Sequence, residues 1–472
     1  MAKKIRLVFI PSPGTGHLVS TVEFAKLLIN RDHRLHITML LLKTPHDDSH
    51  ALTTSLASSP FSDRIHIISI ITSDSSNSVT LTKNQTLLIK QAVTNLVRSS
   101  DPDSPKLAAF VVDMFCATMN DVAREFGVPT FVFFTSGVAF LGLVLHLYKL
   151  RERDNIDATE LKGTDTELAM PSFVNPVPVK VFPSAALDKE WDSIFLSYAK
   201  GLSEVDGFIV NSFEELESHA IHSFSDSYGI PLYPVGPILN LKDDHNNSDN
   251  DESKEIMKWL DDQPPSSVIF LCFGSKGTFD EVQVREIARA VEASGTRFLW
   301  SLRKPPPISS MSKPSNYTLQ DLVKVLPDGF LDRTAGIGRV IGWAPQAQVL
   351  AHRAIGGFVS HCGWNSILES VYFRVPIATW PLRAEQQTNA FQLVQELNMA
   401  VEIALDYRVG RNTLLSAEKI ERGLRDLLEK NEEIKKKLKG VSEKSKKTLL
   451  EGGSSYSYLG HFIDYIVNQE QN

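Results

Sequence analysis

The chain has 472 residues, of which 42% are hydrophobic and 22% are charged. This length predicts two domains, and the balance of residue types excludes disordered, collagen-like and coiled-coil classes. The net charge of −7 gives no electrostatic footprint for nucleic acid or anionic lipid, so neither is an expected partner.

The cysteines and the N-terminus indicate a compartment. The three cysteines are far apart and lack zinc-site spacing, which favours a reducing environment: Cys116, Cys272 and Cys362. The first apolar run, Leu7–Ile10, is too short for a secretory signal and is typical of a core strand. With no apolar run of spanning length, we expect a cytoplasmic protein without a membrane span.

Short apolar runs alternate with helical patterns through the first half of the chain. Predicted strands are Leu7–Ile10, Leu35–Leu42, Leu107–Val112 and Thr130–Phe133. Predicted helices are Val19–Asn30, Thr118–Phe126 and Ala139–Arg151. This order of strand then helix predicts an α/β, parallel, doubly wound sheet.

A polar interval then divides the chain. Residues 241–255 cannot bury an apolar face, and they predict an exposed linker between an N-terminal domain at 1–240 and a C-terminal domain at 256–450. Strands are expected again at Val268–Cys272, Phe298–Ser301, Val340–Ile341, Phe358–Ser360 and Ile377–Thr379. The Lys-rich stretch Glu432–Lys447 predicts a solvated helix, and residues 451–472 contain an amphipathic closing helix.

Two polar residues follow strands of the first domain. His17 comes after Leu7–Ile10 in a Gly-rich turn, and Asp113 directly follows Leu107–Val112. Both are therefore expected at the carboxyl edge of the sheet, where doubly wound folds bind ligands. A histidine taken alone is more often structural.

The segment from Trp343 to Gln386 holds the strongest functional pattern. Strand Phe358–Ser360 leads through His361 and a turn at Gly363 into a helix opened by Asn365 and Ser366. A helix N-terminus with free N–H groups beside a histidine predicts an anion site. One turn further, Glu369 lies on the same helix face and is suited to ribose hydroxyls.

This segment resembles the plant secondary-product signature of family 1 UDP-glycosyltransferases. The matching motifs within it are Trp343-Ala344-Pro345-Gln346, His361-Cys362-Gly363-Trp364-Asn365-Ser366, Glu369 and Glu385-Gln386. Landmarks elsewhere also match: Pro11 to His17, Asn211 to Leu216, Tyr233 to Pro237, Trp259 to Asp261 and Phe273 to Ser275. The resemblance implies the GT-B fold, in which two Rossmann-like domains face a cleft, with the donor mainly on the C-terminal domain. It also implies that the closing helix packs back on the N-terminal domain.

The resemblance carries roles onto these positions. The uracil and ribose would meet Trp343, Ala344, Gln346 and Glu369. The diphosphate would meet Ser275, His361, Gly363, Asn365 and Ser366. The sugar hydroxyls would meet Thr135, Trp364, Glu385 and Gln386, and the closing Gln goes with a glucose preference. His17 would be the general base and Asp113 its orienting partner.

The implied reaction is inverting transfer of glucose from UDP-glucose to a hydroxyl of a small lipophilic acceptor, giving a β-glucoside. We expect no cofactor and no metal, because the Asp-x-Asp pairs at Asp101 and Asp249 lie in polar loops. A C-glycosyltransferase and a non-catalytic UDP-sugar binding protein remain alternatives, and a monomer is expected.

The acceptor is not readable from the sequence, and flavonoids, other phenolics and terpenoids all fit. An apolar, aromatic pocket is expected from Gly16, Phe140, Leu143, Phe182, Trp191 and Arg383. Arg383 departs from the family pattern, which has a ring at this position. Its guanidinium is expected either to recognise an anionic acceptor or to point to solvent.

Overall fold

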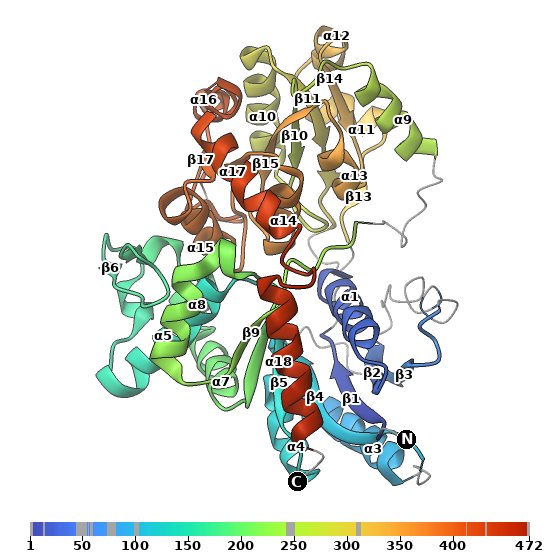
Figure 1. The fold of residues 1–472 in the computed structure, drawn as a ribbon. Helices are drawn as coiled ribbons and strands as arrows, with labels where there is room; N and C mark the ends of the chain where they lie inside the picture. Colours follow the sequence, from blue (N-terminus) through green and yellow to red (C-terminus); the bar gives the residue numbers. More distant parts are fainter. Residues whose placement is uncertain are drawn as a thin grey trace.

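Two parallel sheets organise the molecule, in two lobes joined at their centre (Figure 1). The computed structural model describes residues 3–12, 15–43, 54, 56, 60–72, 82–98, 103–241, 251–307, 313–411, 413–429 and 432–469. The expectation of an α/β architecture with two doubly wound sheets is confirmed.

The N-terminal sheet has seven strands in the order β3-β2-β1-β4-β5-β8-β9, all parallel. They span Ile65–Ile71, Leu35–Lys43, Ile5–Ile10, Lys106–Asp113, Thr130–Phe134, Gly207–Val210 and Leu232–Pro234. Alternate residues of β1 enter different cores: Leu7 and Phe9 lie on one face, and Val8 and Ile10 on the other. Both faces are thus buried, as expected of a parallel sheet covered by helices.

Different helices cover the two faces of this sheet. On one face lie α1 (Thr15–Arg31) and α18 (Ser454–Gln469), the dark red helix along the lower lobe of Figure 1. The other face is covered by α3 (Lys83–Arg98), α5 (Val138–Asp154), α7 (Asp192–Ser203) and α8 (Glu214–Tyr228). The last helix of the chain therefore packs against the first domain, with Phe462 fully buried beside Phe24 and Phe131.

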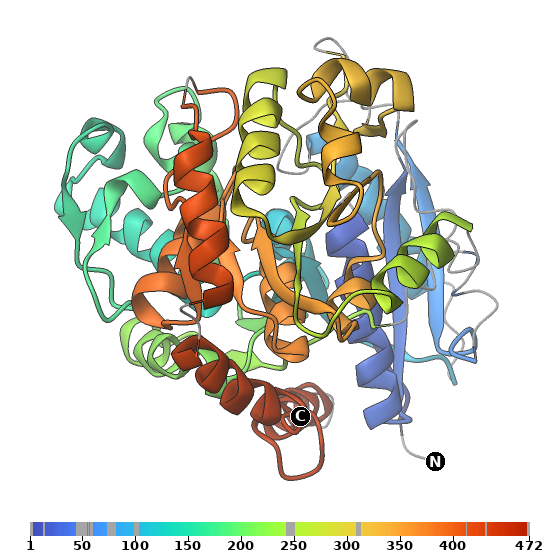
Figure 2. The same ribbon diagram turned by 90° about the horizontal axis from the view of Figure 1, so that it is seen from above.

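The C-terminal sheet has six parallel strands in the order β14-β11-β10-β15-β16-β17. They span Gly338–Ile341, Arg297–Ser301, Val268–Cys272, Ile355–Ser360, Ile377–Thr379 and Ala400–Glu402. Helices α10 (Glu281–Ser294) and α16 (Ala417–Glu429) lie side by side over one face, as Figures 1 and 2 show. The opposite face is covered by α9 (Asp251–Asp261), α13 (Gln346–Ala351), α14 (Trp364–Phe373) and α17 (Glu432–Ser445).

Several boundaries differ from the sequence prediction. α1 begins at Thr15, so His17 lies in its first turn and not in a loop before it. The predicted helix Thr118–Phe126 is divided into a 3₁₀ helix at Met114–Met119 and α4 at Asn120–Glu125. α9 begins at Asp251, so the end of the predicted linker is helical and buries Ser253, while residues 242–250 lie outside the described residues. The short strands β8, β9 and β17 carry too few residues for a periodic signal.

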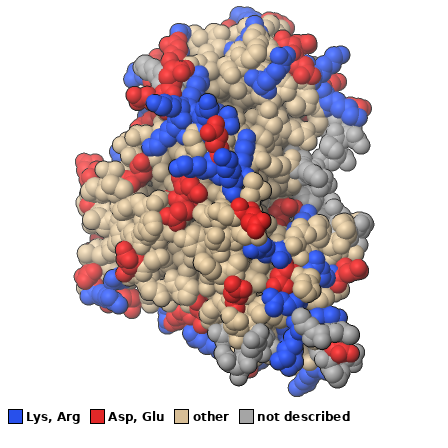
Figure 3. Space-filling model, in the orientation of Figure 1, with Lys and Arg blue, Asp and Glu red and all other residues tan. Residues whose placement is uncertain are grey.

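The Lys-rich helix α17 presents a charged face. Lys and Arg side chains gather over it in Figure 3, and Lys435, Lys436 and Lys439 line a shallow surface hollow there. Its other face buries Leu438 and Ser442 against α14. Among the described helices, none has the length and apolarity to cross a membrane.

The two lobes are joined by buried polar contacts. The Trp364 indole donates to the Asn211 carbonyl at 2.7 Å, and Gln392 donates to the Glu217 carboxylate at 2.8 Å. The buried Glu217 side chain also accepts from the backbone N–H groups of Val138 and Ala139 at the start of α5. Because buried polar groups are costly to leave unpaired, these contacts hold the domains in one orientation.

Candidate active site

His17 and Asp113 meet at the carboxyl edge of the N-terminal sheet. The His17 Nδ1 lies 2.8 Å from the Asp113 Oδ2. Asp113 has a fully buried side chain, whereas 30% of the His17 side chain is exposed. A carboxylate only accepts hydrogen bonds, so Nδ1 carries the proton and Nε2 keeps a free lone pair. This is the arrangement of a general base with an orienting acid.

Local structure holds both partners in place. Asp113 ends β4 and caps the following 3₁₀ helix, because its Oδ1 accepts from the Phe115 N–H at 3.0 Å. Thr135, just after β5, brings its hydroxyl oxygen to 3.0 Å from the same His17 Nδ1. That hydroxyl can donate to the Met114 sulfur at 3.7 Å. The imidazole is therefore fixed by the ends of two strands as well as by its own helix.

Opposing effects act on the pKa of His17. Burial lowers it, but the charge and hydrogen bond of Asp113 raise it, and the charge of Glu385 raises it further against a small opposing effect of Lys276. The net pKa lies above the ordinary value for histidine. Burial raises the pKa of Glu385 itself, and the two groups, one from each domain, sense each other's charge.

The helix that carries His17 contacts the helix of the predicted anion site. Asn365, at the start of α14, donates to the Ser20 hydroxyl at 3.3 Å, and Ser20 in turn donates to the Gly16 carbonyl. A Cβ on Gly16 would lie 3.9 Å from the Asn365 Nδ2. Gly16, expected in the acceptor pocket, thus lies opposite the first turn of α14.

His361 lies between two glycines at the end of β15. A Cβ on Gly274 would come within 2.7 Å of its Nε2, and a Cβ on Gly363 within 2.5 Å. Gly363 is therefore required for space, whereas the left-handed residue of the turn is Cys362, with φ of 62°. The His361 Nδ1 is buried and has no hydrogen-bond partner in the described part of the chain. Burial, with the nearby charge of Arg383, lowers the pKa of His361 to about 4, so it is neutral at pH 7.

The residues expected at the nucleoside converge. Gln346, the first residue of α13, donates to the Glu369 carboxylate at 2.7 Å and to the Ser366 hydroxyl at 2.9 Å. Trp343 is half-buried just before this helix, and the next residue, Ala344, is buried. An amide and a carboxylate from two successive βα units thus meet, and Trp343 lies three residues before the amide, a set suited to a flat base and a ribose.

The residues expected at the sugar differ in which of their hydrogen-bonding groups are available to a ligand. Glu385 precedes α15 (Gln386–Phe391), whose first residue is Gln386. The Gln386 side-chain oxygen accepts from the backbone N–H groups of Leu382 and Arg383, which leaves its NH₂ group to bind a ligand. The Trp364 side chain is 3% exposed and its N–H is bound to Asn211, so only its backbone is available to a sugar.

The expected acceptor wall requires correction. Phe140, Leu143 and Phe182 are 6%, 0% and 0% exposed and belong to the hydrophobic core, so they do not line an open surface. Trp191, by contrast, is 43% exposed at the start of α7. Their apolar character was read correctly from the sequence, but it serves the packing of the domain.

Arg383 turns toward the donor side. Its Nη2 donates to the Lys276 carbonyl at 2.9 Å, in the loop that follows β10 and contains Ser275. Ser275 is exposed in this loop. Arg383 is exposed, and this contact places it beside the loop of the predicted diphosphate site, while its expected role toward an acceptor stays a prediction.

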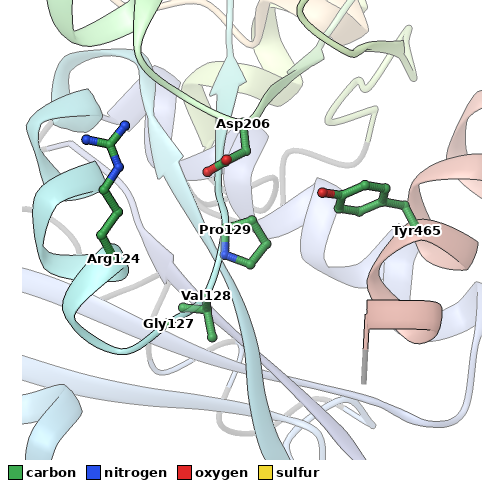
Figure 4. A pocket seen from close by; sticks show the side chains of 6 residues that line it. All are labelled: Arg124, Gly127, Val128, Pro129, Asp206 and Tyr465. Carbon is green, nitrogen blue, oxygen red and sulfur yellow. The ribbon is translucent and has the colours of Figure 1, made fainter. Parts of the chain in front are cut away.

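Two observations bear on other sites. A pocket of about 330 Å³ is lined by Arg124, Gly127, Val128, Pro129, Asp206 and Tyr465 (Figure 4). It lies where β5 begins, at the sheet edge opposite to Asp113, and so is separate from the catalytic pair. Within the described ranges, no three His, Cys, Asp or Glu side chains gather as metal ligands, and Asp101 and Asp249 lie outside those ranges.

Sequence reasoning missed three polar residues of the site region. Ser20, Lys276 and Glu217 belong to no pattern that the sequence displays, because their partners are far away in the chain. The one local hint is that Lys276 and Glu217 each directly follow a family landmark, the former Phe273 to Ser275 and the latter Asn211 to Leu216.

Comparison with known proteins identifies the family. The model of the UDP-glucoronosyl and UDP-glucosyl transferase family matches residues 186–436, more than half of the chain. The chain belongs to this family, and it is a UDP-dependent glycosyltransferase of the plant family 1 type with the GT-B fold.

Individual relatives cover nearly the whole chain. The chain is 50% identical to UDP-glucose flavonoid 3-O-glucosyltransferase 6 of Fragaria ananassa, over 99% of both proteins. It is 49% identical to anthocyanidin 3-O-glucosyltransferase 1 of Manihot esculenta, over 96% of this chain and all of that protein. A transferase from Siraitia grosvenorii in complex with UDP is 45% identical and superposes with a TM-score of 0.89, over 98% of this chain and 100% of that one. A Medicago truncatula enzyme complexed with UDP-glucose is 38% identical, with a TM-score of 0.85 over 98% of both chains.

Proposed function

We propose that this enzyme transfers glucose from UDP-glucose to a hydroxyl of a small phenolic acceptor of the flavonoid class, with inversion and without a metal or other cofactor. The observation that carries the proposal is the His17–Asp113 pair beside the N-terminus of α14. A base and an anion site lie on either side of one reaction centre.

In the proposed reaction, the His17 Nε2 takes the proton of the acceptor hydroxyl, and Asp113 stabilises the imidazolium that forms. The acceptor oxygen forms a bond to the anomeric carbon while the bond from that carbon to the UDP oxygen breaks. The bonding electron pair leaves with UDP, where the dipole of α14 and the N–H of His361 stabilise the charge. Attack opposite the leaving group gives a β-glucoside.

The names of the similar proteins support O-transfer to flavonoid-type acceptors over C-transfer. The intact His17–Asp113 contact argues against a non-catalytic binding protein. Its 2.8 Å separation is within the range of a hydrogen bond that can orient a general base.

The direct test is a panel of flavonols, simple phenols, terpenoid alcohols and acids offered with UDP-glucose, with products identified by mass spectrometry and NMR. We expect O-β-glucosides of the phenolic members. Release of UDP without any glucoside, or a C-glucoside as the main product, would contradict the proposal.

Metal independence has its own test. Turnover is expected to be unchanged after dialysis against EDTA, because groups of the protein itself are proposed to stabilise the leaving-group charge. A complete loss of activity that Mg²⁺ or Mn²⁺ restored would overturn this part of the proposal.

A further inference from the structure

The predicted diphosphate site lacks positive charge among the residues so far assigned to it. His361 is neutral at pH 7, Ser275 is uncharged, and the N-terminus of α14 offers only a partial charge of about one half. A nucleotide diphosphate carries two negative charges when bound in a sugar donor. Full cations beside this site would therefore increase donor affinity, since hydrogen bonds between charged groups are the strong ones.

Two cations lie beside it. Arg383 reaches from the turn before α15 to the loop after β10, where its Nη2 donates to the Lys276 carbonyl at 2.9 Å. Its backbone N–H is held by Gln386 at 3.0 Å, so the start of the side chain is fixed by the same turn that presents the sugar-binding residues. Lys276 follows Ser275 in the loop, and both Arg383 and Lys276 are exposed.

The charges of both cations also act on the histidines of the site. The Arg383 guanidinium lowers the pKa of His361, after the larger effect of burial. Lys276 opposes the rise in the pKa of His17. The charge of one cation is therefore felt at His361 and the charge of the other at His17, the two histidines of the predicted site.

Neither cation is neutralised by the protein. In the part of the chain that the structure describes, no carboxylate forms an ion pair with Arg383 or Lys276. Arg411, which also lies at the domain junction, is by contrast paired with Asp188 at 2.8 Å. Two accessible and unpaired cations at the edge of an anion site are groups that a ligand can neutralise.

We propose that Arg383 and Lys276 form a cationic pair that binds the donor diphosphate and stabilises UDP as it leaves. This inference rests on the proposed function, because it assigns the ligand of the same site. One N–H of Arg383 fixes the loop through the Lys276 carbonyl, and its remaining donors face the phosphates. In this way the chain supplies the charge that other phosphate-binding proteins take from a metal.

The test measures UDP binding by calorimetry, without acceptor or turnover, for Arg383→Met, Lys276→Met and the double variant. Uridine is the second ligand, because it lacks phosphates but keeps the nucleoside contacts. Lys276→Met removes the charge of the side chain but keeps the backbone carbonyl that accepts from Arg383. It therefore tests the charge without removing the hydrogen bond that holds the loop. The matched control is Arg285→Met, since Arg285 in α10 also donates to a lysine carbonyl, that of Lys324 at 2.7 Å in the helix Leu319–Val325.

We expect each single variant to weaken UDP about tenfold or more, with uridine unchanged and the Arg285→Met control equal to the unmodified protein. The dependence of UDP affinity on salt is expected to become shallower in both variants, because each removes a charge contact. Unchanged UDP affinity in Lys276→Met and Arg383→Met would overturn the assignment, as would equal losses for UDP and uridine.

Two further outcomes distinguish this inference from recognition of a carboxylate and from the proposed function. If the variants keep UDP affinity but lose only anionic acceptors or UDP-glucuronic acid, the cations recognise a carboxylate and the diphosphate assignment is wrong. If the unmodified protein binds UDP but makes no glucoside, the proposed function fails while the cationic pair stands on its binding data.

Discussion

The two histidines of the active site lie in different domains, and their surroundings give them opposite protonation behaviour. His17 is hydrogen-bonded to Asp113 and lies near the charge of Glu385, and both raise its pKa. His361 is buried without an acid and close to Arg383, so its pKa is lowered to about 4. In the proposed mechanism, the same side chain is a proton acceptor on one side and a neutral hydrogen-bond donor on the other. Burial and neighbouring charge, and not residue type, set the protonation state of each histidine.

Removing the base should have the largest effect. His17→Ala is expected to lower kcat/KM for an unactivated hydroxyl by about 10²–10⁴, the usual range for loss of a general base. UDP affinity should be nearly unchanged. Steady-state kinetics together with UDP calorimetry check both halves, and normal turnover in the variant would remove His17 from the mechanism. An unusually acidic phenol should be avoided as the only acceptor, since it can react without the base.

Substitution of His361 should lower the rate without changing the shape of the pH profile. His361→Ala is expected to lower kcat by about 10²–10³, the range for loss of one donor to a developing negative charge. Because His361 is already neutral above its pKa of about 4, the pH profile of the remaining activity should keep its shape between pH 6 and 9. A shift of the acid limb in this variant would mean that His361, and not His17, titrates in the working range.

Donor choice tests the sugar end of the C-terminal domain. UDP-glucose is expected to exceed UDP-galactose in kcat/KM by a factor that reflects about 1–3 kcal/mol for each unpaired polar group. Among the described residues, none binds the Gln386 NH₂ group, while its side-chain oxygen accepts hydrogen bonds within its own turn. Gln386→Ala should therefore reduce the preference between the two donors. Equal efficiency with both donors in the unmodified enzyme would remove the basis for a glucose preference.

The smallest expected effect concerns the electrostatic interaction between Glu385 of the C-terminal domain and His17 of the N-terminal domain. The Glu385 charge raises the pKa of His17, so Glu385→Gln should lower that pKa. Because the base acts when deprotonated, kcat/KM rises with pH through the folded pKa, and its acid limb should move to lower pH in the variant. The measurement is the pH dependence of kcat/KM in the variant and in the unmodified enzyme. The absolute rate is not used, because it also reflects lost contacts to the sugar. An unmoved acid limb would show that Glu385 does not act on His17.

Much of the donor side was readable from the sequence because it is local. Residues 343–386 form successive βα units, so the turn at Gly363, the helix opened by Asn365 and the carboxylate at Glu369 follow from order and spacing alone. The alternation of strands and helices likewise predicted two doubly wound sheets, since parallel strands require crossover helices. The approximate place of Asp113 at a strand end belongs to the same kind of local information.

The tertiary structure decided what depends on residues distant in the chain. The pKa of His17 is set by Asp113 and Glu385, 96 and 368 positions away, and no local pattern encodes charges that meet only after folding. The burial of Phe140, Leu143 and Phe182 was equally hidden, because an apolar side chain has the same pattern in a core as in a ligand pocket. The direction of Arg383 depended on a carbonyl in another loop. Sequence order determines which groups a strand end carries, whereas packing determines which groups they meet.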